Sequence, residues 1–342
     1  MKLLNCQFVC FVIGRESGSR MLPDRKEKAD MKYIKGVTFA PFVSKGRIGT
    51  EASNRSLKIM KEQTGADFVI LAPGAIQKTC ISEEIDFSSD ATMTDEELVT
   101  TIRYAKSIGL RVALKPTVNC AAHVWRGHVH FFDIDVPCEP KWGRWFEYYT
   151  KFQLHYAKIA EEEGCEMFIA GCEMVMTEIR EKEWRKLISD IRQVFHGLIS
   201  YNTDKYQEDH VRWWDAVDVI SSSGYYPIHD WENQLDRIET VVKKYDKPFF
   251  FAEAGCMSRN GSNQIPNDWT IQGELDLEGQ AEFYRSMFAA CAKRDWVQGF
   301  GLWSWSEHLK ETEEALKDTG YELYEKPAVE TVKTFYEKNT IR

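Results

Sequence analysis

From residue 33 to residue 338 the chain alternates between strand-like and helix-like segments, and this alternation most constrains its fold. The strand-like segments are short and apolar, whereas the helix-like segments place apolar residues at helical spacing. Strands separated by helices of about ten to fifteen residues form βαβ units, which pair as a parallel sheet. Eight such units favour a closed barrel over an open sheet, so we expect a single (β/α)8 TIM barrel.

The boundaries of these segments can be stated residue by residue. The expected strands cover 35–42, 67–72, 110–118, 166–173, 198–202, 217–225, 248–253 and 297–305. The expected helices cover 53–63, 95–107, 142–163, 181–195, 207–214, 231–245, 278–293 and 328–338. Thr94 and Glu97 form a capping box that fixes the start of the second helix. One domain over residues 31–342, the (β/α)8 barrel, accounts for all of these elements.

Residues 1–30 differ from the rest of the chain. An apolar run over residues 3–13 is followed by a polar, strongly charged stretch over residues 14–30. A weak signal peptide is one interpretation, but only Lys2 precedes the run and no A-x-A-like cleavage site follows it. We favour a poorly ordered N-terminal extension, with the folded unit beginning at Met31.

Composition excludes several classes of function. The net charge of −9 offers no basic surface for nucleic acid or for an anionic membrane, and it suits a neutral substrate. No apolar run reaches the roughly 18 residues of a membrane span. The nine cysteines are odd in number and contain no C-x-x-C pair, which favours reduced thiols and a cytoplasmic location. No Gly-rich phosphate loop follows a strand, so we expect no cofactor.

Two of the apolar strands end on a glutamate. The run from Lys247 to Ala252 is typical of a strand buried on both faces, and Glu253 follows it directly. The run from Glu166 to Cys172 is followed in the same way by Glu173. Side chains at the carboxyl ends of barrel strands face the site of a TIM barrel. Two carboxylates there are what glycosidic bond hydrolysis needs, although either one alone is equally consistent with a solvated strand end.

The other strand ends combine polar and aromatic side chains. Sugar rings present apolar C–H faces beside hydroxyl groups, so a sugar site needs flat aromatic platforms next to short hydrogen-bonding groups. The candidate platforms are Trp303, Trp125, Trp142 and Trp269. The remaining strand-end candidates are Lys115, Asn119, Asn202, Tyr225, Tyr226 and Trp305.

These motifs resemble glycoside hydrolase family 113, the β-1,4-mannanases, within the clan A retaining glycoside hydrolases. The matching segments are KGVTFAPF at 35–42, LKP at 114–116, GCEM at 171–174, GYYPI at 224–228, FAEAG at 251–255 and GLWSW at 301–305. The resemblance covers residues 33 to about 338. It implies a β-linked oligosaccharide or polysaccharide as substrate and a retaining mechanism with two glutamates.

The same resemblance implies roles for individual residues. Glu173 would be the general acid/base and Glu253 the nucleophile, with Tyr225 hydrogen-bonded to the nucleophile. Trp303 would form the floor of the subsite of the transferred sugar. Lys115 and Asn202 would hold sugar hydroxyls, and Asn119 and Trp142 complete the expected substrate-binding set.

One position departs from the clan pattern. Most clan A enzymes carry asparagine directly before the acid/base, where it binds the sugar 2-hydroxyl, and here that position is Cys172. A thiol is a much weaker donor, so the 2-hydroxyl must be held by another group. Mannose carries this hydroxyl axially, which is compatible with the change.

Three alternatives stay open. The same barrel and mechanism would serve xylan or β-glucan oligosaccharides, and a barrel that has lost catalysis would only bind carbohydrate. The loop histidines His123, His128 and His130 could also be metal ligands, but the first strand offers no acidic or histidine partner, so we expect sugar or backbone hydrogen bonds instead. The sequence leaves the oligomeric state undetermined.

Overall fold

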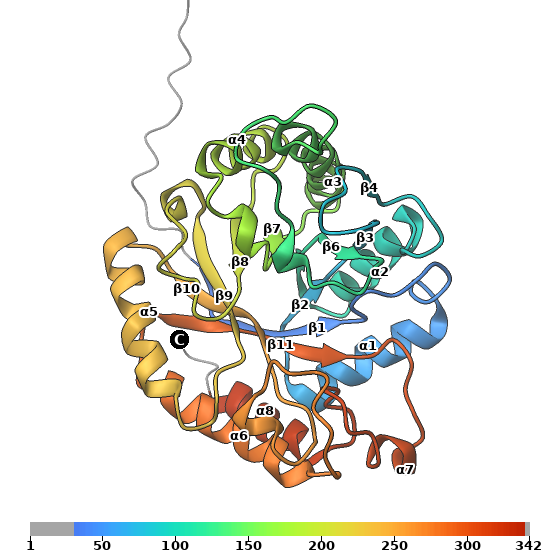
Figure 1. Ribbon diagram of the computed structural model, residues 1–342. Coiled ribbons are helices and arrows are strands. Elements are labelled where there is room, and N and C mark those ends of the chain that lie inside the picture. The colour runs from blue at the N-terminus through green and yellow to red at the C-terminus, as the bar shows by residue number, and fades with distance from the viewer. Residues whose placement is uncertain (1–30, 339–342) are drawn as a thin grey trace, which may run out of the picture.

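The computed structural model describes residues 31–338, and its main element is a closed barrel of eight parallel strands. Around the barrel the strands follow the order β1-β11-β10-β9-β8-β7-β5-β2 (Figure 1). Their bounds are Ile34–Phe39 for β1, Phe68–Leu71 for β2, Arg111–Leu114 for β5, Met167–Cys172 for β7, Leu198–Thr203 for β8, Val219–Gly224 for β9, Phe249–Ala254 for β10 and Val297–Trp305 for β11. The predicted single TIM barrel is confirmed. The predicted extension over residues 1–30 lies outside the described residues.

Helices cover the outside of the barrel. They are α1 (Glu51–Thr64), α2 (Asp95–Ser107), α3 (Trp142–Glu162), α4 (Glu181–Arg192), α5 (Trp231–Tyr245), α6 (Leu277–Cys291), α7 (Thr312–Ala315) and α8 (Pro327–Lys338). The predicted capping box of α2 is present, since the Thr94 hydroxyl accepts from the Glu97 amide and the Glu97 carboxylate accepts from the Thr94 amide. None of the helices within residues 31–338 is long and apolar enough to cross a membrane.

The helix predicted over 207–214 is wrong. This part of the chain forms turns that lead into a short 3-10 helix, η3 (Trp214–Ala216). The Glu208 carbonyl accepts a hydrogen bond from the Trp214 indole, and the Glu208 carboxylate is fully buried against Ser222. These tertiary contacts fix the segment in a non-helical path.

The third predicted strand, over 110–118, is two strands. It breaks after Leu114 at Lys115 and Pro116, and the chain resumes as β6 (Thr117–Cys120). Proline has no amide hydrogen to donate, which favours a break in the ladder at this point. A small separate sheet, ordered β4-β3-β6, joins β6 to β3 (Gly74–Gln77) and β4 (Ile85–Asp86).

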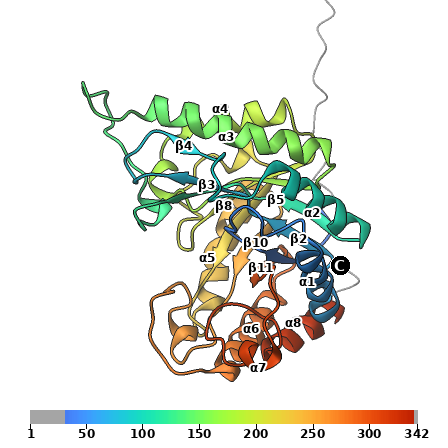
Figure 2. The same ribbon diagram turned by 90° about the vertical axis from the view of Figure 1, so that its right-hand side faces the viewer.

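The barrel interior and the layer between strands and helices form two separate cores. The interior core is small and includes Ile34, Ile70, Ile169 and Phe250. The larger core lies between the strands and the surrounding helices and is rich in aromatic residues. Figure 2, a side view, shows that the connections following β6 and β10 extend beyond the strands on the same side of the molecule. These long connections surround the carboxyl ends of the barrel strands, where the candidate site lies.

Candidate active site

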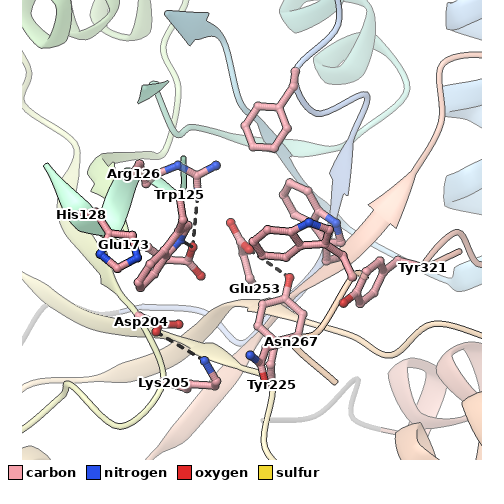
Figure 3. A pocket seen from close by; sticks show the side chains of 13 residues that line it. Trp125, Arg126, His128, Glu173, Asp204, Lys205, Tyr225, Glu253, Asn267 and Tyr321 are labelled. Atoms are coloured by element: carbon pink, nitrogen blue, oxygen red, sulfur yellow. Dashed lines mark hydrogen bonds and ion pairs between the residues drawn. The ribbon is translucent and has the colours of Figure 1, made fainter. Parts of the chain in front are cut away.

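A cavity of about 630 Å³ opens at the carboxyl end of the barrel. Both predicted catalytic glutamates line it, and Figure 3 shows them facing the same space. Its other lining residues are Phe42, Trp125, Arg126, His128, Asp204, Lys205, Tyr225, Asn267, Trp269, Trp303 and Tyr321. Aromatic side chains beside charged and polar groups are the combination that a neutral sugar requires.

Glu253 reaches this cavity because its strand is irregular. Phe250 and Ala252 of β10 point into the barrel, so strict alternation would turn Glu253 outward. The register of β10 against β9 shifts between Phe251 and Glu253, which inserts one extra residue. Such a bulge re-aims the following side chain, and here it directs a carboxylate to the site.

Three donors hold the Glu253 carboxylate. The Lys115 ammonium and the Cys172 thiol, at 3.1 Å, donate to Oε1, and the Tyr225 hydroxyl donates to Oε2 at 2.9 Å. Burial would raise the pKa of Glu253, but the charges of Lys115 and Arg126 and the hydrogen bonds outweigh it, so the pKa lies below its ordinary value. Glu253 is therefore ionised at neutral pH, although only 4% of its surface is exposed.

Glu173 reaches the cavity through a second strand irregularity. The register of β7 against β8 shifts between Ile169 and Cys172, and Gly171 lies within the shift at a φ of 116°. A Cβ atom on Gly171 would lie 2.3 Å from the Tyr149 hydroxyl, so only glycine fits there. Glu173 itself has a φ of 52°, an uncommon conformation for a non-glycine residue and one that recurs at functional sites.

Glu173 also has three donors, but two of them come from a loop. The Trp125 indole and the Arg126 guanidinium donate to Oε2 at 3.1 and 3.0 Å, and the Ser223 hydroxyl donates to Oε1 at 2.8 Å. Arg126 is in turn fixed by the Val118 carbonyl and the Asn119 side chain. The acid/base candidate is thus held mainly by the segment that follows β6.

The two carboxylates lie close together. One oxygen of Glu173, one of Glu253 and the Cys172 sulfur lie within 4.8 Å of one another. Among residues 31–338 this is the only such cluster of potential metal ligands. Each carboxylate already pairs with a buried cation, Lys115 or Arg126, and these positive charges disfavour a metal ion at the same oxygens.

Tyr225 and Trp303 lie where the sequence analysis expected them. Both line the cavity, and Tyr225 makes the predicted hydrogen bond to Glu253. The candidate platforms Trp125 and Trp269 line it as well. Trp125 has an additional contact that the sequence did not indicate, the hydrogen bond from its indole to Glu173.

Four other predicted substrate-binding residues lie outside the cavity lining. Lys115 is fully buried behind Glu253, and Asn202 is buried beside Lys115 and Ser223. Asn119 accepts from Arg126. The structure corrects the prediction that Trp142 is a sugar platform. Trp142 is the first residue of α3, and its ring packs into the core against Phe131 and Phe146, which leaves only 4% of its surface exposed.

Sequence reasoning missed several residues of the cavity. Arg126, Asp204 and Lys205 lie in connections without periodicity, so no pattern marked them. Phe42 is the last residue of the KGVTFAPF segment at 35–42, and its ring packs on Trp303 with centroids 5.4 Å apart. The Arg126 guanidinium also lies over the Phe42 ring. His128 contacts Trp125 edge-on at the cavity, whereas His130 is exposed and contacts Trp142 edge-on outside the cavity lining.

A pair of buried carboxylates in an aromatic cavity, at the carboxyl ends of the fourth and seventh strands of a TIM barrel, defines a glycoside hydrolase. Comparison with known families agrees, because the model of glycoside hydrolase family 113 matches residues 37–326. The chain belongs to glycoside hydrolase family 113.

Solved structures of the same family are similar over almost their whole length. A family 113 β-1,4-mannanase shares 53% identity with a TM-score of 0.89, covering 90% of this chain and 99% of that one. A family 113 β-mannanase from Alicyclobacillus acidocaldarius, solved in complex with ManMIm, shares 38% identity with a TM-score of 0.88, covering 91% and 99%. A Ruminococcus gnavus β-glucuronidase, 11% identical with a TM-score of 0.61 over 89% of this chain and 50% of that one, shares the fold alone. No curated protein matches the chain.

Proposed function

We propose that this glycoside hydrolase cleaves β-1,4-mannosidic bonds in mannan or manno-oligosaccharides by a retaining double displacement. The observation that carries the mechanism is the approach of the Glu173 and Glu253 carboxylate oxygens to within 4.8 Å. Retaining enzymes keep their carboxyl groups about 5 Å apart, whereas inverting enzymes need at least about 6.5 Å to admit a water molecule. The substrate assignment is supported by the family 113 relatives, which are β-1,4-mannanases.

In the first step Glu253 is the nucleophile. Its ionised carboxylate attacks the anomeric carbon, the bond from that carbon to the glycosidic oxygen breaks, and Glu173 gives its proton to the departing oxygen. Lys115, buried behind Glu253, and Tyr225, which lines the cavity, orient the Glu253 carboxylate. Trp303 lines the cavity with its ring facing the Lys115 ammonium that pairs with Glu253, and it offers a flat surface for the sugar that becomes covalently bound.

In the second step Glu173 is the base. It takes a proton from a water molecule, whose oxygen attacks the anomeric carbon and releases Glu253 as a carboxylate. The two displacements invert the anomeric carbon twice, so the product keeps the β configuration. Arg126 and Trp125 stabilise the ionised Glu173 that exists between the two steps.

We also propose a cytoplasmic location, with imported short oligosaccharides as the working substrates. The seven cysteines between residues 31 and 338 are all free thiols, including exposed Cys138, which fits a reducing compartment. Fractionation of the source cells, followed by detection of the protein with an antibody, would test this location. Recovery outside the cytoplasm would contradict it.

The test of the main proposal is digestion of mannohexaose followed in real time by proton NMR. We expect shorter manno-oligosaccharides whose new reducing ends appear first as the β anomer, and product lengths that distinguish internal from terminal cleavage. First appearance of the α anomer would overturn the retaining mechanism. Intact mannohexaose together with cleaved xylohexaose or cellohexaose would overturn the mannan assignment while leaving the mechanism in place.

A further inference from the structure

The contacts of Glu173 suit its proposed role as a base but conflict with its proposed role as an acid. Hydrogen bonds from Trp125, Arg126 and Ser223 all favour the ionised carboxylate, and one of these donors carries a positive charge. The first step, however, requires a protonated Glu173. A neighbouring negative charge would favour the protonated form of a carboxyl group.

Asp204 is placed to supply this charge. It directly follows β8, the strand beside β7, and the Glu173 amide donates to the Asn202 carbonyl of β8 at 2.7 Å. Asp204 lines the same cavity as Glu173, and Figure 3 shows its carboxylate on the Glu173 side. Only 7% of its surface is exposed. Within residues 31–338 its side-chain partner is Lys205, at 3.4 Å between Nζ and Oδ2.

The charges around this pair of acids are mixed. Burial and the charge of Glu173 raise the pKa of Asp204, Lys205 lowers it, and the result is about 7. The other titratable groups facing either acid are Arg126, Cys172, Glu253, Tyr225 and Tyr321 around Glu173, and Glu178 and Tyr206 around Asp204.

We propose that Asp204 is a positioning residue for the proton of Glu173: its carboxylate keeps the acid/base protonated for the first step, and Lys205 limits this effect. The proposal rests on the proposed role of Glu173 as acid/base. The proton that leaves with the aglycone comes from Glu173, and water returns one in the second step. Asp204 forms no bond to the sugar in this scheme, and it acts through charge alone.

The test is the pH dependence of kcat/KM for mannohexaose in Asp204→Asn, Lys205→Met and the control Asp209→Asn. Loss of the Asp204 charge lowers the proton affinity of Glu173, so the basic limb moves to lower pH by about one unit. Loss of the Lys205 charge moves the basic limb to higher pH, because Lys205 then no longer offsets the charge of Asp204. Asp209 is exposed and pairs with Arg237 at 2.8 Å outside the cavity, so the same change of charge there leaves the limb in place.

A second substrate separates this role from the alternatives. 2,4-Dinitrophenyl β-mannoside has a leaving group that needs no protonation, so its glycosylation step in Asp204→Asn should match that of the wild type. A basic limb that is unmoved in both Asp204→Asn and Lys205→Met would overturn the proposal. If kcat/KM of Asp204→Asn falls equally at every pH, and only for mannohexaose, Asp204 would instead be assigned to binding of the leaving sugar. That result would also overturn the proposal.

Failure of the underlying function would look different. If Glu173 is not the acid/base, Glu173→Gln loses activity equally on mannohexaose and on the dinitrophenyl glycoside, and the wild-type basic limb survives in that variant. If Asp204→Asn does not fold, as judged by its thermal transition, the opposite shift expected of Lys205→Met still decides the question.

Discussion

Glu253 and Glu173 are buried to a similar extent, 4% and 8% exposed, yet the molecule holds them in different ways. The donors to Glu253 come from barrel strands or the residues directly after them, namely Lys115, Cys172 and Tyr225. Two of the three donors to Glu173 come from the long connection after β6. The proposed nucleophile is thus fixed by the rigid barrel, and the proposed acid/base is fixed by a loop added to it.

This difference matches the chemistry that we propose for each carboxylate. A nucleophile needs one protonation state before it attacks, and a cation behind it on a rigid strand secures that state. An acid/base must gain and lose a proton in each cycle, so its environment must leave the two states close in free energy. In our proposal Arg126 and Asp204 serve this second requirement, because they present opposite charges to Glu173.

The largest effect is expected from Glu253→Ala, because no other group can form the covalent bond. We expect kcat/KM for mannohexaose to fall by about four orders of magnitude or more. Added azide should enter the space left by the side chain, attack the anomeric carbon of 2,4-dinitrophenyl β-mannoside directly and give the α-mannosyl azide, identified by NMR. Formation of the β azide would show that Glu253 is not the nucleophile.

Glu173→Ala is expected to cost less and to depend on the leaving group. Loss of general acid catalysis should lower kcat/KM for mannohexaose by about 100- to 10,000-fold. The first step with 2,4-dinitrophenyl β-mannoside should be almost unaffected, so a burst of dinitrophenol should precede slow turnover. Azide should then attack the glycosyl-enzyme and give the β-mannosyl azide, opposite to the product of Glu253→Ala. The absence of a burst would contradict this role.

Lys115→Met tests whether the Lys115 ammonium, which directly follows barrel strand β5, keeps Glu253 ionised. The positive charge holds the pKa of Glu253 down, so without it burial raises this pKa and the acid limb of kcat/KM moves to higher pH, by more than about one unit. Leaving a buried carboxylate unpaired should also destabilise the protein by about 3–5 kcal/mol. The pH profile and the thermal transition measure both effects.

The control for this variant is Lys45→Met, which removes an exposed lysine paired with Asp90. Neither the acid limb nor the thermal transition should move noticeably, because exposed pairs contribute little. If Lys115→Met leaves the acid limb where the wild type has it, another group keeps Glu253 ionised.

The sequence predicted the regular parts of the fold well because periodicity and capping act locally. The bounds predicted for α2 and α5 are those observed, and the strand predicted over 248–253 is β10 to within one residue. Strand β7 was similarly clear. The ends of these strands identified both glutamates, since a carboxylate after a fully apolar run is unusual enough to stand out.

What the sequence could not predict depends on contacts between distant residues. Strict alternation would point Glu253 away from the cavity, and only the bulge in β10 turns it inward. Arg126 lies in an aperiodic loop, and Trp142 differs from Trp125 only in the direction that the fold gives it. The role of Lys115 likewise follows from its depth behind Glu253 rather than from its position at a strand end.

The smallest effect is expected from Cys172→Ala, which removes one weak donor from the Glu253 side. The thiol contacts Glu253 rather than the open cavity, and burial raises its pKa well above the ordinary value, so it donates as a neutral group. One weak hydrogen bond corresponds to about 0.5–1 kcal/mol, so kcat/KM for mannohexaose should fall about two- to fivefold. Cys165→Ala, a buried cysteine that precedes β7 at the opposite end of the barrel, should leave kcat/KM unchanged. A loss of more than about 100-fold in Cys172→Ala alone would mean that the thiol itself contacts the sugar, as the asparagine expected at this position would.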